Sequence, residues 1–157
     1  MKLLMLLLAV LLMGCVGVVE GKGRPTDKGL PPGQARNCNT QHLQAALGGN
    51  LSTDATLAPG EELGLYATYM NWSDGKQLVN VSVTWIGDQP ELRLPAEWVT
   101  FDTTQFCVQA NDYRRVEIVV TVPLDASPGR YMGLFDFSVC KELICVSVAA
   151  RVRLTVA

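Results

Sequence analysis

Apolar and polar residues alternate with a period of two along most of the chain after residue 60, and this pattern constrains the fold most. In the clearest run, 114–122, every second residue from Val116 to Val122 is Val or Ile. Successive side chains of a strand point to opposite faces of a sheet, so the pattern predicts strands with one buried face. Similar runs fall at 55–57, 61–70, 78–86, 98–101, 105–109, 131–140 and 145–156.

Turn-forming residues separate these runs. They include Ser73-Asp74-Gly75, Gly87 to Pro90, Asn111-Asp112 and Pro123 to Gly129. Seven or eight short strands at this spacing predict an all-β, antiparallel sandwich of two sheets. We expect Gly129 to adopt a backbone conformation that a side chain would strain.

One short helix is expected near 40–47. Asn39 or Thr40 can cap its start, and Gly48 can end it. The apolar residues at positions 43, 46 and 47 would share one helical face.

Composition excludes several classes of protein. The 157 residues are 48% hydrophobic and 18% charged, with 13 Lys and Arg against 15 Asp and Glu. The chain is too apolar for a disordered protein, and its net charge of −2 provides no basic surface for nucleic acid. The length predicts one globular domain.

The N-terminus has the pattern of an export signal: Lys2 is followed by an apolar run up to Val19. The segment Leu12-Met13-Gly14-Cys15 resembles the lipobox of prokaryotic lipoproteins, which implies lipid attachment at Cys15. Two alternatives are an ordinary signal peptide cut after Gly17 or Gly21 and an uncleaved signal anchor. We expect a signal peptide at 1–14, a Gly- and Pro-rich linker at 15–36, and the sandwich at 37–157.

Four cysteines remain after Cys15, an even number that predicts two disulfides in an exported chain. Three pairings are open. The alternation places Cys140 and Cys145 on the same face of two runs joined by a short loop, which favours a bond between them and leaves Cys38 to pair with Cys107. Metal binding is not expected, because His42 is the only histidine and no closely spaced cysteine pair accompanies it.

Three sequons predict surface glycosylation, at Asn50, Asn71 and Asn80. Asn71 has an alternative role, because Asn-Trp-Ser-Asp-Gly is a turn sequence. Asn80 alternates with valines, which points it outward.

Several segments resemble a known family. They are Leu57-Ala58-Pro59-Gly60-Glu61, Pro95-x-x-Trp98-Val99 and Val122-Pro123-x-Asp125-Ala126-x-Pro128-Gly129-x-Tyr131-x-Gly133. From 57 to 156 the chain resembles the immunoglobulin-like surface modules of archaea and bacteria, which include alpha-galactosidase-associated and CARDB-type domains. The resemblance implies an immunoglobulin-like sandwich that serves as a spacer, an adhesive unit or a carbohydrate-associated accessory. The cysteine-closed hairpin and the Cys38 segment depart from the family pattern.

No catalytic constellation is apparent, so we expect neither an enzyme nor a cofactor. Cys38 lies four residues from His42, but a disulfide would remove it as a nucleophile. The loop carboxylates are explained by turn formation rather than by calcium. Trp85 and Trp98 are expected in the core, and Trp72 is the candidate exposed aromatic residue.

The expected function is that of a non-catalytic cell-surface module in envelope structure or adhesion, anchored to the membrane by a lipid or a signal anchor. One alternative is a carbohydrate-binding accessory protein. Another is a subunit of a surface filament assembled by strand addition, for example through 24–38. The expected partners are envelope proteins, glycans or other copies of the chain.

Overall fold

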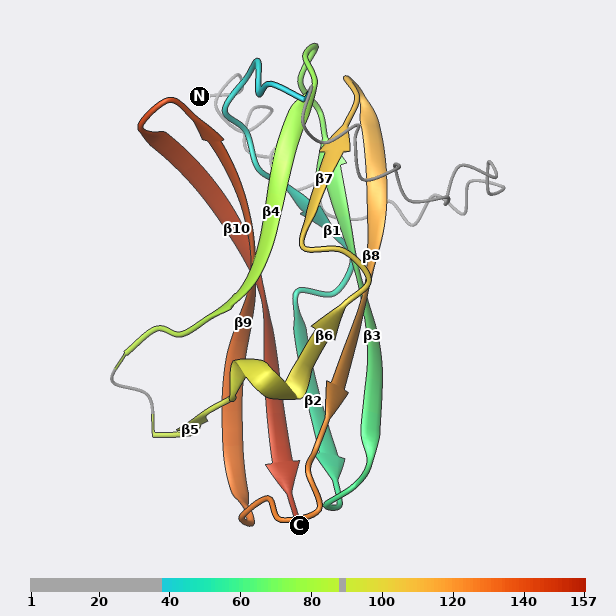
Figure 1. Ribbon diagram of the computed structural model, residues 1–157, viewed down its shortest axis with the longest axis vertical. Coiled ribbons are helices and arrows are strands. Elements are labelled where there is room, and N and C mark those ends of the chain that lie inside the picture. Colours follow the sequence, from blue (N-terminus) through green and yellow to red (C-terminus); the bar gives the residue numbers. More distant parts are fainter. Residues whose placement is uncertain (1–37, 88–89) are drawn as a thin grey trace, which may run out of the picture.

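The alternating runs form the strands of two sheets that pack face to face (Figure 1). The computed structural model describes residues 38–87 and 90–157. The smaller sheet has the order β1-β3-β8-β6, with β1 at Leu47–Gly48, β3 at Glu62–Asn71, β8 at Asp112–Thr121 and β6 at Val99–Phe101. The larger sheet has the order β2-β10-β9-β4-β7, with β2 at Ser52–Leu57, β10 at Ile144–Val156, β9 at Gly129–Lys141, β4 at Gln77–Thr84 and β7 at Gln105–Val108.

This architecture confirms the predicted two-sheet β-sandwich. Two very short strands were not predicted, β1 and β5 (Leu92–Arg93), and a single-turn 3-10 helix lies at Ala96–Trp98. The strands pair antiparallel except at two places. There β2 runs parallel to β10, and β5 runs parallel to the start of β9.

The core lies between the sheets and is formed by every second residue of the long strands. Val116, Ile118 and Val120 of β8 face it, as the alternation predicts. Tyr69 and Phe137 are fully buried, and their rings stack across the two sheets. Trp98 is buried against Tyr131, whereas Trp85 is half-buried. The two tryptophans therefore differ in how far they enter the core.

The prediction of a helix at 40–47 is wrong, because this segment is extended and ends in β1. Its backbone groups bond to other parts of the fold instead of to one another: Gln41 N donates to Lys76 O, and Met70 N donates to Ala46 O. Leu43, Ala45 and Leu47 pack against the core, which is the odd-numbered face of an extended chain. A helical stripe at 43, 46 and 47 fits the same residues almost equally well, so periodicity did not distinguish them.

A buried polar pair holds this extended segment in place. The Tyr69 hydroxyl lies 2.9 Å from both Gln44 O and Gln77 Oε1, and Gln77 Nε2 donates to His42 O and Gln44 O. Burial raises the pKa of Tyr69 above its ordinary value, so the hydroxyl stays protonated as a donor. The segment at 41–44 is thereby fixed across one end of the sandwich.

Candidate interaction edge

The longest hairpin of the fold, β9–β10, projects beyond its neighbours. Its two strands pair over their full length, from Gly129 with Val156 to Lys141 with Ile144, and only Glu142 and Leu143 form the tip. Glu142 adopts a positive φ of 56° there. Figure 1 shows the tip leaning away from the rest of the sandwich. Leu143 is 100% exposed and Ile144 is also exposed, so the tip presents apolar side chains to solvent.

Among the described residues, one side of this hairpin has no paired strand along half its length. β10 pairs with β9 from Ile144 to Val156, but it pairs with β2 only from Arg151 to Val156. In the described part of the chain no other strand pairs with β10. We call β10 from Ile144 to Ala150, on the side away from β9, the open edge.

The backbone groups that face the open edge can be identified from the register. Arg151 N donates to Leu51 O, so the odd-numbered residues of β10 point toward the β2 side. The Cys140 and Cys145 Cα atoms lie 4.1 Å apart, which is the spacing of a pair that exchanges no backbone bonds across the hairpin. The N–H and C=O groups of Cys145, Ser147 and Ala149 therefore point outward along the open edge.

The side chains of the open edge lack the features that protect most exposed strands. Exposed edges are usually blocked by charges, prolines or bulges, yet 144–150 reads Ile-Cys-Val-Ser-Val-Ala-Ala. Val146 and Val148 face the core but are only half-buried. A further strand placed here would satisfy the outward groups and cover these valines, so the open edge is suited to strand addition.

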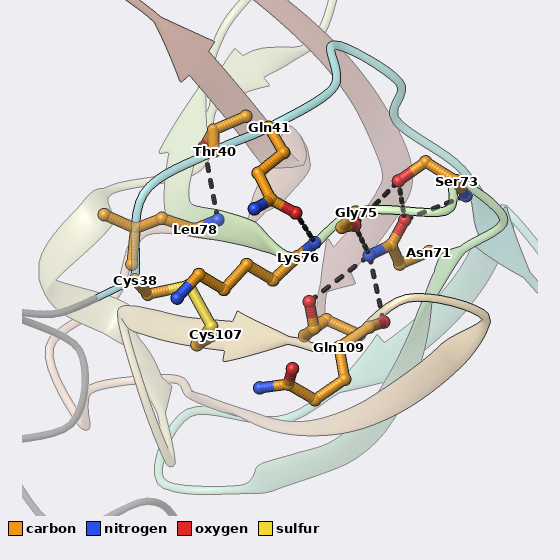
Figure 2. The surroundings of a disulfide bond; sticks show 11 residues. Cys38, Thr40, Gln41, Asn71, Ser73, Gly75, Lys76, Leu78, Cys107 and Gln109 are labelled. Carbon is orange, nitrogen blue, oxygen red and sulfur yellow. Dashed lines mark hydrogen bonds between the residues drawn. A yellow bond between two sulfur atoms is a disulfide. The ribbon is translucent and has the colours of Figure 1, made fainter.

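Both disulfides that the sequence favoured are present. Cys140 bonds Cys145 across the hairpin next to the open edge. Cys38 bonds Cys107 of β7, as Figure 2 shows, with the segment that follows Cys38 crossing β4. There Thr40 Oγ1 accepts from Leu78 N, and Gln41 Oε1 accepts from Lys76 N. The Cys38–Cys107 bond thus joins the start of the described chain to the edge strand β7.

Asn71 stabilises a turn, which is the alternative to glycosylation that its sequence left open. Its side chain is 1% exposed, and Nδ2 lies 2.8, 3.2 and 2.9 Å from the carbonyl oxygens of Gly75, Val108 and Gln109. Its Oδ1 accepts from the backbone N–H and the hydroxyl of Ser73, which Figure 2 shows together with two of the carbonyl contacts. A glycan on Nδ2 is incompatible with these bonds.

The other two sequons lie nearer the surface. Asn50 is exposed in the turn before β2, and its Oδ1 accepts from Ser52 N. Asn80 is half-buried on β4, and its Oδ1 accepts from Gln105 Nε2. Both leave Nδ2 without a hydrogen bond to the described residues, unlike Asn71.

Trp72 is 61% exposed, and two further aromatic residues share its side of the smaller sheet. Tyr66 on β3 and Tyr113 on β8 are both exposed, and the alternation places them on the outer face with Trp72 just beyond the end of β3. The Arg115 guanidinium lies 3.6 Å from the centroid of the Tyr66 ring. The sequence predicted only Trp72 as an exposed aromatic residue. The pairing of β3 with β8 places the two tyrosines on the same face, and this pairing could not be seen in the sequence.

A shallow polar pocket of about 350 Å³ lies where β2, β9 and β10 meet the start of β5. In it Arg153 lies between two carboxylates, with Nη1 4.0 Å from Asp54 Oδ1 and Nε 3.7 Å from Glu91 Oε1. Arg130 also lines the pocket, so its charges balance. No histidine or lysine lies among the lining residues.

The remaining predicted features lie outside the described residues or on the surface. Cys15, the export signal and the linker at 15–36 fall within 1–37, which the structure does not describe. No helix among the described residues is long and apolar enough to cross a membrane. Among the same residues no three potential ligands gather into a metal site, and His42 forms an exposed pair with Asp74 at 2.8 Å.

The sequence did not reveal the open edge. A signal was present, because 144–150 is a charge-free run within a strand, but an interior strand has the same composition. Only the short length of β2 shows that half of β10 has no partner on this side.

Comparison with solved structures supports an immunoglobulin-like fold. The PapD-like ASH domain of human CEP192 matches with a TM-score of 0.55 at 13% identity, over 90% of this chain and 97% of that chain. The E. coli chaperone DraB matches with a TM-score of 0.51 at 15% identity, over 73% and 56% of the two chains. A family 123 glycoside hydrolase from Clostridium perfringens matches with a TM-score of 0.58 at 13% identity, over 74% of this chain and 27% of that one.

These similarities show the fold and nothing narrower. The chain spans about a quarter of the hydrolase and little more than half of the chaperone. No protein-family model matches the sequence, and no curated protein does so either. The predicted immunoglobulin-like sandwich is therefore confirmed at the level of fold.

Proposed function

We propose that this protein is a non-catalytic immunoglobulin-like module of the cell surface, which acts in envelope structure or adhesion by binding an extended segment of another protein chain. The open edge is the observation that carries this proposal. It combines outward backbone groups at three alternate positions with half-buried valines and no charge. Strand addition uses such groups for affinity and such side chains for specificity.

Export is supported by the two disulfides and by the apolar N-terminal run. Disulfides persist in oxidising compartments, and the structure contains two of them, Cys38–Cys107 and Cys140–Cys145. We propose that Cys15 carries a lipid that tethers the domain through the linker at 15–36. We further propose that Asn50 and Asn80 are glycosylated. We also propose that the chain is a CARDB-type or alpha-galactosidase-associated module.

The solved structures with this fold are consistent with a role in protein binding. One match is a chain of the Salmonella enterica SafA pilin in complex with the SafB chaperone, at a TM-score of 0.51 and 14% identity. That structure contains a pilin in complex with a chaperone. We carry over to this chain only the idea that a sandwich of this fold can bind another protein.

A photo-cross-linking experiment tests the proposal in cells that export the full chain. With p-benzoylphenylalanine at position 147, we expect covalent adducts to an envelope protein, because Ser147 is exposed at the centre of the open edge. The matched control carries the same group at Thr121, an exposed position on the outer face of β8. Equal adduct yields at the two positions, or none at 147, would overturn the proposal.

A second function is favoured by the three exposed aromatic residues on the smaller sheet. Tyr113 and Trp72 offer flat apolar faces with polar edges, which suits them to sugar rings, whereas Arg115 covers one face of Tyr66. On a glycan array we expect binding that is lost in the Tyr113→Ala and Trp72→Ala variants and kept in the Leu124→Ala variant, which removes an exposed apolar side chain elsewhere. An array without signal would overturn this second function.

A further inference from the structure

We infer that the occupant of the open edge is a second copy of this chain, which pairs antiparallel with the first through β10 and joins the two larger sheets into one. This inference rests on the proposed function, because it names the partner of the same edge. It is argued from the register of β10, which is self-complementary about one residue, Ser147.

Antiparallel pairing about Ser147 uses every outward group of the open edge. Ser147 lies opposite Ser147 of the second copy, and Cys145 lies opposite Ala149 of the second copy. These are the residues whose N–H and C=O groups point away from β9, so each opposed pair exchanges two backbone hydrogen bonds. Sliding the second copy by two residues leaves some of these groups without partners, and sliding it by one places outward groups against inward ones.

The side chains fit the same register. On the inner face Val146 lies opposite Val148 of the second copy, and pairs of β-branched residues stabilise adjacent strands. On the outer face the opposed side chains are small, since they are Ser147 with its equivalent and Cys145 with an alanine. No charged residue occurs between Ile144 and Ala150, so no like charges meet across the two-fold axis.

The ends of the paired region also match the structure. Arg151 N is already bonded to Leu51 O, so β2 closes the edge at this point. In the register about Ser147, the last opposed pair is therefore Ala150 with Ile144 of the second copy, because Ser52 of β2 occupies the place opposite Arg151. Leu51 and Leu143 are both exposed in the single chain.

Disulfide cross-linking tests the register directly. In the Ser147→Cys variant the two introduced cysteines would face each other at a Cα separation of about 5.5 Å, which a disulfide can bridge. We expect a covalent dimer on mild oxidation, identified by peptide mapping without reduction. The Arg151→Cys variant is the matched control, because residue 151 is exposed on the same strand and its two copies would be separated by about 26 Å along the strand. Equal cross-linking of both variants, or none at 147, would overturn the register.

Sedimentation of the exported, full chain tests the association itself. We expect a concentration-dependent dimer that is abolished by Ser147→Lys, which places two like charges at the two-fold axis, and kept in Ser147→Thr. Ser147 is exposed, so melting curves should show both variants folded. A chain that stays monomeric at its highest soluble concentration would overturn the second copy as the partner. If photo-cross-linking at position 147 then yields a different envelope protein, the proposed function stands and only the second copy as partner is wrong. If photo-cross-linking at this position yields no adduct, the proposed function and the inference of a second copy both fail.

Discussion

Removal of the Cys38–Cys107 disulfide should lower the free energy of unfolding by about 4 kcal/mol. The two cysteines are separated by 69 residues, and closing a loop of this length restricts the unfolded chain strongly. The bond also holds the extended segment after Cys38 against β4 (Figure 2). We expect the Cys38→Ala/Cys107→Ala double variant to show this loss in urea unfolding monitored by circular dichroism.

The Cys140–Cys145 bond provides the internal comparison. Its cysteines are separated by only 5 residues, so the Cys140→Ala/Cys145→Ala variant should lose about 2 kcal/mol. In that variant we expect β10 to keep its backbone pairing with β9. If the hairpin bond proved the more stabilising of the two, loop closure in the unfolded chain would not explain the contribution of either bond.

The sequence was sufficient to predict the longer strands and the Cys140–Cys145 bond because both depend on local alternation, and the Cys38–Cys107 bond then followed by elimination. The run at 114–122 became β8, and the runs at 131–140 and 145–156 became the β9–β10 hairpin with its cysteines opposed. Parity along a strand is a property of neighbouring residues, so it can be seen without knowing which strands pair. The segment at 40–47 was predicted wrongly because its conformation is set by distant partners, namely Tyr69 and Gln77.

The glycines show the same division between local and distant causes. Gly129 has an ordinary backbone conformation, so the expectation of strain there is wrong. The positive φ of 89° belongs to Gly60, in the turn before β3. At Gly133 the constraint is a neighbour, since a Cβ atom would lie 2.8 Å from Leu94 Cδ2. Leu94 reaches this place because the chain returns beside β9 after β5, and no pattern in the sequence shows this return.

The open edge could not be predicted for a related reason. Whether a strand lies inside or at the edge of a sheet depends on the length of its neighbour, and β2 ends its pairing with β10 at Arg151. The same seven residues would be fully paired if β2 were longer. Candidate sites that consist of backbone groups are therefore visible only in the folded chain.

The Asn71→Asp substitution should lower the free energy of unfolding by about 3 to 5 kcal/mol, because it changes a fully bonded donor into a buried charge. Asn71 Nδ2 donates toward the carbonyl oxygens of Gly75, Val108 and Gln109, which tie the turn after β3 to the end of β7. A carboxylate oxygen in place of this nitrogen would face those three oxygens with no proton to donate. The side chain is buried, so water cannot replace the lost donors.

The effect of this substitution should depend on pH in a defined direction. Burial beside carbonyl oxygens favours the neutral acid, so the pKa of the new carboxyl should be higher in the folded chain than in the unfolded chain. Protonation at low pH restores one donor, and the deficit relative to the original protein should therefore shrink as the pH falls through that raised value and be greatest above it. Urea unfolding at several pH values measures this trend.

Asn80→Asp is the matched control for the Asn71→Asp substitution. Asn80 is half-buried, and only its Oδ1 forms a hydrogen bond, as an acceptor from Gln105 Nε2. A carboxylate oxygen can still accept this bond. Similar losses in the two variants would show that the bonds of Nδ2 do not hold the turn to β7.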